Sequence, residues 1–251
     1  MTSFEPCSAE VLRRYARVSG GTCMEIAGGV AAYCGAGSPL GVVKGMERGV
    51  SAGELKSIVD FYADRQMAAI VEIAPWVEQE SLGALSELGF VKIATENLMA
   101  CQAADGGEDV EECKDADAWA RMLAVAFFGE VTDEWMDLGR MVFEVNGGLN
   151  VGIWRDGVLA AGGNITYLDG VALFAGDATI EEYRGQGLQQ QLIRGRMRRA
   201  HEAGCSWLHC EVVPGSGSQR NYERCGFTLA YQRMHYQRSL ASDGNDIALR
   251  D

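Results

Sequence analysis

The stretch that most constrains the fold is 177–205, DATIEEYRGQGLQQQLIRGRMRRAHEAGC. It leaves an apolar run, makes a polar turn that holds Gly185 and Gly187, and enters a segment with helical spacing over 188–203. Glycines at that place leave the first backbone N–H groups of the helix uncovered, and the helix dipole adds positive charge there. The turn therefore predicts a binding place for a phosphate or pyrophosphate that needs neither a metal nor a lysine.

Two common phosphate-binding motifs do not fit this turn. The dinucleotide fingerprint GxGxxG requires a third glycine where this chain has Gln190, and no GK[ST] follows as it would in a P-loop. The frame EEYRGQG instead resembles the [RQ]-x-x-G-x-[GA] motif of the GNAT superfamily of N-acetyltransferases, through Arg184 and Gly187. Gln189 stands where that family usually has Gly or Ala, which keeps the N–H donors but crowds the pyrophosphate. An ordinary strand–helix connection is the alternative.

A second segment, SGSQRNYERCGF, resembles the N-x-x-A-x-x-L-Y-x-x-x-G-F segment in which the family often ends. Tyr222, Gly226 and Phe227 match it, whereas Gly215 stands at the Asn position and removes one expected side-chain contact to the cofactor. Ser216 and Ser218 are the candidates to replace that contact. With the strands before the RGQG turn, the resemblance extends over about residues 109–238.

The resemblance implies acyl transfer from acetyl-CoA to an amine, which attacks the thioester directly. The pyrophosphate of the cofactor would be held by backbone N–H groups of the turn, and the thioester would be aligned by the preceding strand. The residues that the resemblance assigns to acetyl-CoA are Ala178, Thr179, Arg184, Gly185, Gln186, Gly187, Leu188, Gln189 and Ser218.

The resemblance assigns the proton donor for the leaving thiolate to Tyr222, and an aromatic residue that only packs the short helix is the alternative. A phenol with a pKa near ~10 protonates a thiolate well only when it lies close to it. Removing the proton from a lysine-like amine at neutral pH costs about 4–5 kcal/mol, so a general base is of use. Asp177 and Glu211 are the two candidates, and direct loss of the proton to water is a third route.

The helix after the turn carries four arginines, Arg194, Arg196, Arg198 and Arg199. We expect them to form a solvated basic face that also suits the negative end of the helix dipole. Contact with the 3′-phosphate of CoA, or with a partner, is the alternative.

Alternating apolar residues predict strands over 151–154 and 158–167, joined by an Asp-Gly turn, and a third strand over 171–179. The order helix, strand, short helix, Gly-Phe, strand occurs twice, over 54–101 and 188–238, but the first copy lacks the Arg-x-x-Gly-x-Gly spacing. We therefore predict an α/β (α+β) chain of two GNAT-like domains, each a twisted, mixed, mostly antiparallel sheet flanked by helices. Residues 1–103 would be the degenerate domain and residues 104–251 the catalytic one, with chance similarity as the alternative.

The formal net charge of −13 argues against general binding to nucleic acid or to an anionic membrane. Eight cysteines occur without a C-x-x-C pair and with only three histidines, so we expect reduced thiols, no metal site and a cytoplasmic location. No apolar run approaches the ~20 residues that span a bilayer. The expected partner is a small-molecule amine or a peptide amine, and the oligomeric state stays open.

These features together predict an acyl-CoA-dependent N-acetyltransferase that moves an acetyl group from acetyl-CoA to an amine. The alternative from another class is a module that binds acyl-CoA, or serves as a scaffold, and transfers nothing. The scarcity of convincing base candidates is the sequence feature that favours this alternative.

Overall fold

The computed structural model describes residues 4–145 and 149–240. The elements of the N-terminal half are α1 (Glu5–Val18), β1 (Thr22–Ile26), β2 (Gly29–Tyr33), β3 (Val43–Lys44), α2 (Ala52–Ala63), β4 (Ala69–Ile73), α3 (Pro75–Glu87) and β5 (Val91–Gln102). Those of the C-terminal half are β6 (Glu111–Glu112), α4 (Ala116–Leu123), the π-helical turn η1 (Ala124–Phe128), α5 (Asp133–Val145), β7 (Leu149–Arg155), β8 (Val158–Leu168), β9 (Val171–Thr179), the 3-10 turn η2 (Glu181–Tyr183), α6 (Leu188–Glu202), β10 (Trp207–Val212), α7 (Gly217–Arg224) and β11 (Thr228–Arg238).

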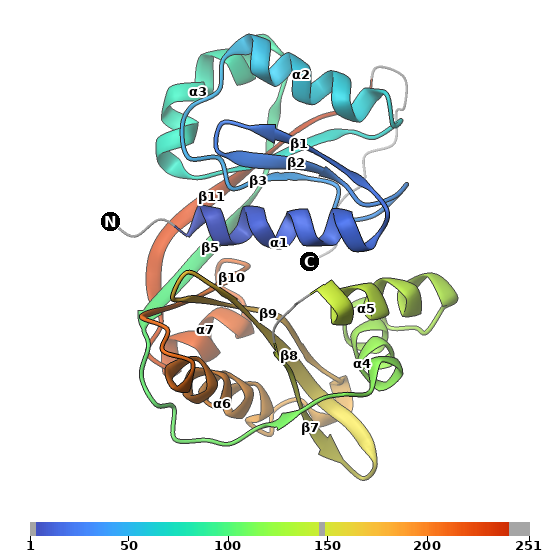
Figure 1. Ribbon diagram of the computed structural model, residues 1–251, viewed down its shortest axis with the longest axis vertical. Coiled ribbons are helices and arrows are strands. Elements are labelled where there is room, and N and C mark those ends of the chain that lie inside the picture. The colour runs from blue at the N-terminus through green and yellow to red at the C-terminus, as the bar shows by residue number, and fades with distance from the viewer. Residues whose placement is uncertain (1–3, 146–148, 241–251) are drawn as a thin grey trace.

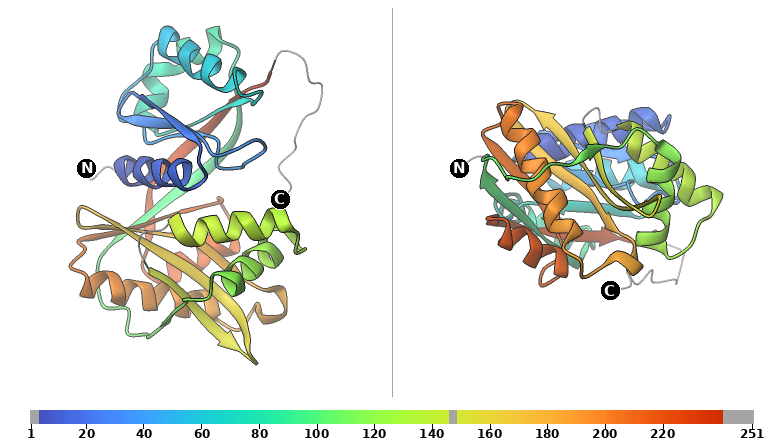
Figure 2. Two further views of the ribbon diagram at one scale, coloured as in Figure 1. Left: turned by 45° about the vertical axis from the view of Figure 1, so that its right-hand side comes forward. Right: turned by 90° about the horizontal axis from the view of Figure 1, so that it is seen from below.

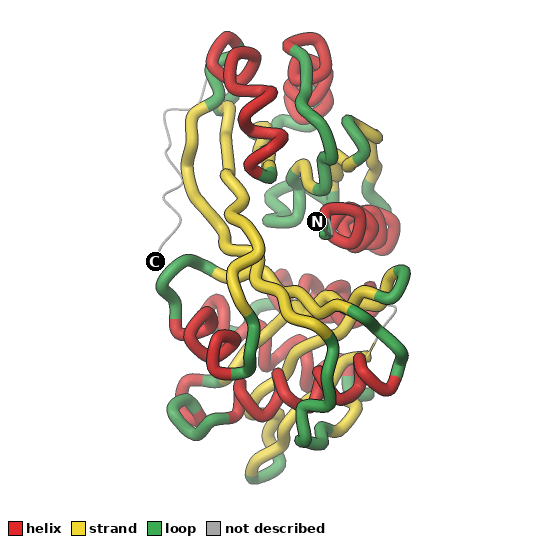
Figure 3. Tube along the Cα trace, turned by 90° about the vertical axis from the view of Figure 1, so that its left-hand side faces the viewer, coloured by secondary structure: helices red, strands yellow, loops and turns green. Residues whose placement is uncertain are grey.

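The described strands join one mixed sheet in the order β1-β2-β3-β4-β11-β5-β10-β9-β8-β7-β6. They pair antiparallel except for β3 with β4 and β9 with β10, which are parallel. The mixed sheet flanked by helices confirms the predicted fold class. The sheet runs unbroken through both halves, because β11 pairs with β4 and β5 pairs with β10. β5 and β11 also pair with each other, and these two long strands connect the upper and lower parts of the molecule (Figures 1 and 3).

Helices cover both faces of the sheet in the C-terminal half. Phe174 of β9 packs in the same buried cluster as Ile193 of α6, whereas its neighbour Leu173 packs with Leu12 of α1 and Val145 of α5. Successive strand residues point to opposite faces, so α6 lies on one face, and α1 and α5 lie on the other (Figure 2). α1 also contacts β2, β3 and α5 and lies between the two halves (Figure 1).

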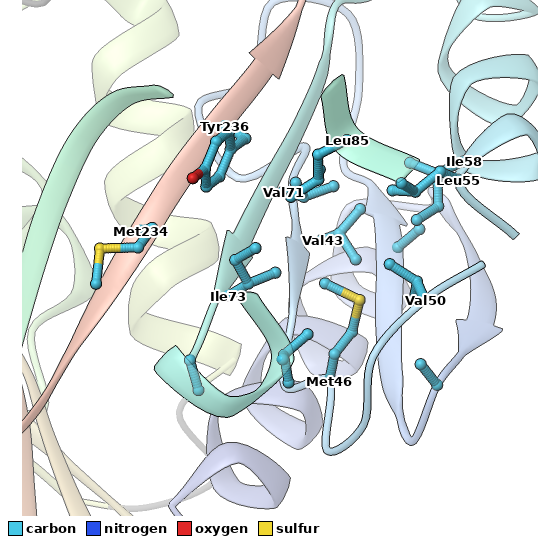
Figure 4. Close-up of a cluster of buried hydrophobic side chains, with 14 of the residues drawn as sticks. Val43, Met46, Val50, Leu55, Ile58, Val71, Ile73, Leu85, Met234 and Tyr236 are labelled. Atoms are coloured by element: carbon cyan, nitrogen blue, oxygen red, sulfur yellow. The ribbon is translucent and has the colours of Figure 1, made fainter. Parts of the chain in front are cut away.

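The core of the N-terminal half contains side chains from the C-terminal half. Val71 and Ile73 of β4 and Leu55 of α2 are buried together, and Met234 and Tyr236 of β11 complete the same cluster (Figure 4). The final strand of each half, β5 or β11, thus pairs with a strand of the other half, and the two halves share a hydrophobic core as well as a sheet.

Two local signals of the sequence agree with the structure. Ser51 caps α2 by accepting from the backbone N–H of Glu54, whose carboxylate accepts from the backbone N–H of Ser51. Asp156 and Gly157 have φ values of 50° and 78°, as the two central residues of a type I′ turn require. Across the described part of the chain, we find no helix with the length and apolar character that a membrane crossing demands.

Candidate active site

β9 and β10 begin as paired parallel strands and then separate. The last residues in register are Phe174 and Cys210. Just beyond this pair β9 bulges relative to β8, and Gly176 in the bulge has a φ of 64°, which glycine adopts without strain. A bulge bends its strand and redirects the side chains beside it. Among the residues that the structure describes, none therefore pairs with the β10 side of β9 from residue 175 onward, and Asp177 lies in this opening.

The turn between β9 and α6 has the open form that the sequence predicts. Gly187 is the N-cap residue of α6 with a φ of 78°, no side chain caps the helix, and its first turn holds no acidic residue. A Cβ atom on Gly185 or Gly187 would meet no other atom within 4 Å. Arg184 fixes the turn, because its guanidinium donates to the backbone carbonyls of Thr179 (3.2 Å) and Ala126 (3.5 Å).

A cavity of about 550 Å³ extends from this turn to Asp177. Its wall includes Ala126 and Phe127 of η1 and Asn221 of α7. Eight of the nine residues predicted to bind acetyl-CoA line it; the exposed Gln186 lies in the turn but outside the lining. The eight are Ala178, Thr179, Arg184, Gly185, Gly187, Leu188, Gln189 and Ser218.

Asp177, Tyr222 and Arg196 form a closed polar triad at the wall of the cavity. The Tyr222 hydroxyl donates to Asp177 Oδ2 at 2.6 Å. Arg196 Nη1 lies 2.5 Å from Asp177 Oδ1, and Arg196 Nη2 donates to the Tyr222 oxygen at 3.3 Å. Asp177 lines the cavity, whereas Tyr222 and Arg196 lie behind it and are fully buried.

Burial raises the pKa of Tyr222 well above its usual value of 10. The guanidinium of Arg196 acts in the opposite direction, and the carboxylate of Asp177 adds to the rise. The phenol therefore stays protonated through the neutral pH range, with its proton held toward Asp177.

The expectation that the α6 arginines form one solvated basic face is wrong for Arg196, whose side chain is 0% exposed. Its guanidinium donates to the carbonyls of Leu192 and Asn164 and lies 4.7 Å from the ring centroid of Phe174. The spacing of apolar residues along α6 indicates this burial. Arg196 occupies the fourth position after Leu192, in a stripe that repeats every four residues and otherwise contains small or apolar side chains.

Comparison with known families agrees with this geometry. Residues 116–227 match the model of the Acetyltransferase (GNAT) family. These residues therefore form a GNAT acetyltransferase domain. Comparison with curated proteins found no match to the sequence.

Solved structures share the GNAT fold over most of the chain. A GCN5-related N-acetyltransferase from Kribbella flavida is 20% identical with a TM-score of 0.67, over 94% of this chain and 96% of that one. A tandem GNAT protein from the clavulanic acid biosynthesis pathway is 13% identical with a TM-score of 0.57, over 73% of this chain and 68% of that one. A conserved protein of unknown function from Staphylococcus epidermidis is 11% identical with a TM-score of 0.58, over 87% and 94%. At these identities the likeness concerns the fold alone.

Glu211, the other candidate base, does not line the cavity. Its Oε1 accepts from Ser8 Oγ at 2.9 Å and from Arg233 Nη1, and its Oε2 accepts from Lys44 Nζ at 2.8 Å. Burial opposes ionisation of Glu211, but Arg233 and Lys44 outweigh it and hold its pKa well below the usual 4.5. This carboxylate joins strands of the two halves.

Beside Glu211 lies a group with metal-ligand chemistry. Side-chain atoms of Glu72, Glu96 and His235 lie within 4.8 Å of one another and could hold a metal ion. Lys44 Nζ already lies 2.8 Å from Glu72 Oε2 and supplies positive charge at that place. The three residues lie on β4, β5 and β11, and β10 separates these strands from β9, which leads into the phosphate turn. None of the three lines the cavity.

Proposed function

We propose that the protein transfers an acetyl group from acetyl-CoA to an amine, which attacks the thioester directly. The observation that carries this proposal is one cavity whose lining includes both the uncapped N-terminus of α6 and Asp177, which lies in the opening between β9 and β10. The first end suits a pyrophosphate, and the second holds a carboxylate with a phenol behind it. The acceptor would be a small-molecule amine or a peptide amine, and we place the reaction in the cytoplasm.

Residues 185–189 would hold the pyrophosphate through backbone N–H groups. Gln189, which departs from the family motif, is tied to α7: its amide donates to Ser218 Oγ at 2.9 Å and accepts from Asn221 Nδ2 at 2.7 Å. The Gln189 side chain is thereby engaged with α7, which supports Gln189 and Ser218 as a wall of the site. Ala178 and Thr179 would align the thioester along β9.

Tyr222 does not line the cavity itself; it would give a proton to the leaving thiolate by way of Asp177, to which its hydroxyl donates at 2.6 Å. Of the two candidate bases, Asp177 is the one we assign to the amine, because it lines the cavity and Glu211 does not. The distinction matters chemically because a base must lie within about 3 Å of the proton that it removes, directly or through one water.

The N-terminal half would be a degenerate copy of the GNAT domain, so that residues 1–103 and 104–251 form a tandem pair. The shared element order supports this: three strands, a helix, a strand, a helix and a final strand occur as β1 to β5 and again as β7 to β11. The first copy would shape and cover the second without binding CoA.

A substitution at the phosphate turn tests the cofactor site. Gly187→Val places two methyl groups in the open space that the pyrophosphate would need, so we expect CoA affinity to fall at least tenfold, about 1.4 kcal/mol. Gly204→Val is the matched control, because Gly204 has a φ of 77° and equally open surroundings at the other end of α6. Both variants carry the same backbone strain. Calorimetry that finds equal CoA affinities for the two variants would remove the site assignment.

Turnover separates the enzyme from the CoA-binding module without activity. A panel of alkyl, aryl and peptide amines is incubated with acetyl-CoA, and released thiol is measured. We expect amine-dependent thiol release. A protein that binds CoA in calorimetry and releases no thiol with any amine of the panel is the binding module.

A further inference from the structure

We infer that Glu72, Glu96 and His235 form a binding site for a divalent transition-metal ion, with Zn²⁺ as the ion that fits their chemistry best. The site would join β4, β5 and β11 at the junction of the two halves of the chain. The inference goes beyond the proposed acetyl transfer and does not depend on it, because none of the three residues lines the cavity.

The pairing of the strands brings the three side chains to one face of the sheet. Glu72 lies directly opposite His235 in the antiparallel pair of β4 and β11. On the other side of β11, His235 lies opposite Ala94, and Glu96 is two residues further along β5. Residues opposite each other, and residues two apart on one strand, point to the same face. The three ligands come from distant parts of the chain, so no local spacing of residues could indicate the site.

The distances between the donor atoms suit a metal ion better than hydrogen bonds. His235 Nε2 lies 3.9 Å from Glu72 Oε2 and 3.8 Å from Glu96 Oε2, and the three atoms all lie within 4.8 Å of one another. Hydrogen bonds from nitrogen to oxygen extend only to about 3.2 Å. Donor atoms about 2.1 Å from a tetrahedral Zn²⁺ lie about 3.4 Å apart, so movements of about half an ångström would complete the coordination.

The three donor atoms are buried and lack hydrogen bonds. His235 Nε2 and Glu96 Oε2 have no hydrogen-bond partner among the described residues. Glu72 Oε2 also has none, although the ammonium of Lys44 lies 2.8 Å from it. The Glu72 side chain is only 9% exposed, so bulk water does not replace the missing partner. Buried polar atoms are nearly always paired, and one metal ion would pair all three.

The surrounding residues supply less positive charge than the carboxylates require. Lys44 and Arg233 form ion pairs with four carboxylates, those of Glu5, Glu72, Glu96 and Glu211. When all four are ionised, the excess of two negative charges equals the charge of a divalent cation. Lys44 need not exclude the ion, because its Nζ also lies 2.8 Å from Glu211 Oε2 and keeps that partner when Glu72 Oε2 turns to the metal.

The ligand types indicate which ions would bind. One imidazole nitrogen and two carboxylate oxygens are all common ligands of Zn²⁺, whereas Mg²⁺ and Ca²⁺ prefer oxygen alone. The side chains of His235 and Glu96 are 16% and 21% exposed, so an ion and a water ligand can reach the site from the surface. A bound ion would tie β4 to β5 and β11, the two long strands that connect the halves (Figure 3).

The test titrates Zn²⁺ into chelator-treated protein, with calorimetry and the melting temperature as readouts. We expect one ion per chain, and a rise in Tm of about 5 °C or more when free Zn²⁺ is 100-fold above its Kd. Mg²⁺ at the same concentration should not change the Tm. Loss of even an outer partner of a metal ligand lowers affinity about 10–100-fold, so His235→Gln and Glu96→Gln should each weaken binding about 100-fold or more.

Two controls exclude zinc binding at the surface. His201→Gln removes an exposed imidazole and Cys23→Ser removes an exposed thiol, and both variants should bind Zn²⁺ as the wild type does. Co²⁺ in place of Zn²⁺ should give d–d absorption without a thiolate charge-transfer band, because the proposed ligands contain no sulfur. If one ligand variant does not fold, as circular dichroism would show, the other carries the test.

Three results would overturn the site: no binding of Zn²⁺ by the wild type, wild-type affinity in a folded His235→Gln or Glu96→Gln variant, or a thiolate band with Co²⁺. Each of them would leave acetyl transfer standing, since the cavity and its residues are not involved. Conversely, a protein that binds Zn²⁺ as expected and releases no thiol with any amine would contradict the proposed function alone.

Discussion

In each half of the chain a strand leads through a turn into a helix that returns to a parallel strand: β3 to α2 and β4 in the first half, β9 to α6 and β10 in the second. The two helices begin differently. Ser51 caps α2 and Glu54 occupies its third position, whereas α6 begins with Gly187 and has Gln190 at its third position. In α2 the Ser51 side chain accepts from the backbone N–H of Glu54, whereas no side chain of the described residues caps the first N–H groups of α6. The same architecture is thus structural in one half and open to an anion in the other.

The same contrast appears in the short helix before the last strand of each half. Tyr222 lies five residues before Phe227, in the Gly-Phe pair that follows α7, and Leu85 lies five residues before Phe90, in the pair that follows α3. Both side chains are about 1% exposed. Leu85 brings only apolar surface to the core, whereas Tyr222 brings a hydroxyl to Asp177 and Arg196.

A second comparison concerns two glutamates near the ends of the corresponding strands β4 and β10. Glu72 and Glu211 both lie 2.8 Å from Lys44 Nζ, so one ammonium joins the two halves. Glu211 also binds Arg233, and its pKa is well below the usual value. Burial raises the pKa of Glu72, and Lys44 only partly opposes the rise. The buried charge of Glu211 is therefore fully compensated by its cationic partners, and that of Glu72 is not.

The largest expected effect follows from this difference. Glu211→Gln leaves Arg233 and Lys44 without their shared carboxylate, and breaking a buried ion pair from one side costs about 3 kcal/mol or more. Glu72→Gln removes a carboxylate that burial already disfavours, so we expect a loss of about 1 kcal/mol or less. Urea denaturation at pH 7 measures both free energies of unfolding. Equal losses would contradict the comparison.

The pH dependence of the two variants should differ in sign. The pKa of Glu211 is lowered in the folded state, so its contribution is complete above pH 4.5 and is lost as the pH falls below that value. The pKa of Glu72 is raised, so the folded state binds the proton first and gains stability as the pH falls toward 4.5. Relative to the wild type, Glu211→Gln should remove the loss of stability at low pH, and Glu72→Gln should remove the gain of stability as the pH falls toward 4.5.

The sequence alone was sufficient for the local features of this comparison. The glycines predicted the turn before α6, and the Asp-Gly pair predicted the turn between β7 and β8. The sequence was insufficient to predict that β5 pairs with β10 and that β11 pairs with β4. The alternation of apolar residues along a strand indicates which face is buried, but not which distant strand lies beside it. Arg196 was misjudged for a related reason: burial of a charge depends on a partner, and Asp177 is 19 positions away in the chain.

A smaller effect is expected when the third position of α6 is made like that of α2. Gln190→Glu adds a carboxylate to the cavity wall within the first turn, where it would repel a bound pyrophosphate, and CoA affinity should fall about tenfold, or ~1.4 kcal/mol. Gln191→Glu makes the same change one position later, outside the cavity lining, and should weaken binding less. Calorimetry at two salt concentrations distinguishes charge from shape, because only a charge effect shrinks as salt rises.

The smallest expected effect comes from removing the side-chain cap at the start of α2. Ser51→Ala removes the side-chain acceptor for the backbone N–H of Glu54, and the loss of such a cap costs about 1 kcal/mol of stability. Ser57→Ala is the control, since the Ser57 hydroxyl only donates to the carbonyl of Gly53 within the same helix, and it should change the free energy of unfolding by less than ~0.5 kcal/mol. CoA affinity should be unchanged in both, because no residue of α2 lines the cavity. If Ser51→Ala altered CoA binding as Gln190→Glu is expected to, the start of α2 would belong to a ligand site, and the division between a closed and an open half would not hold.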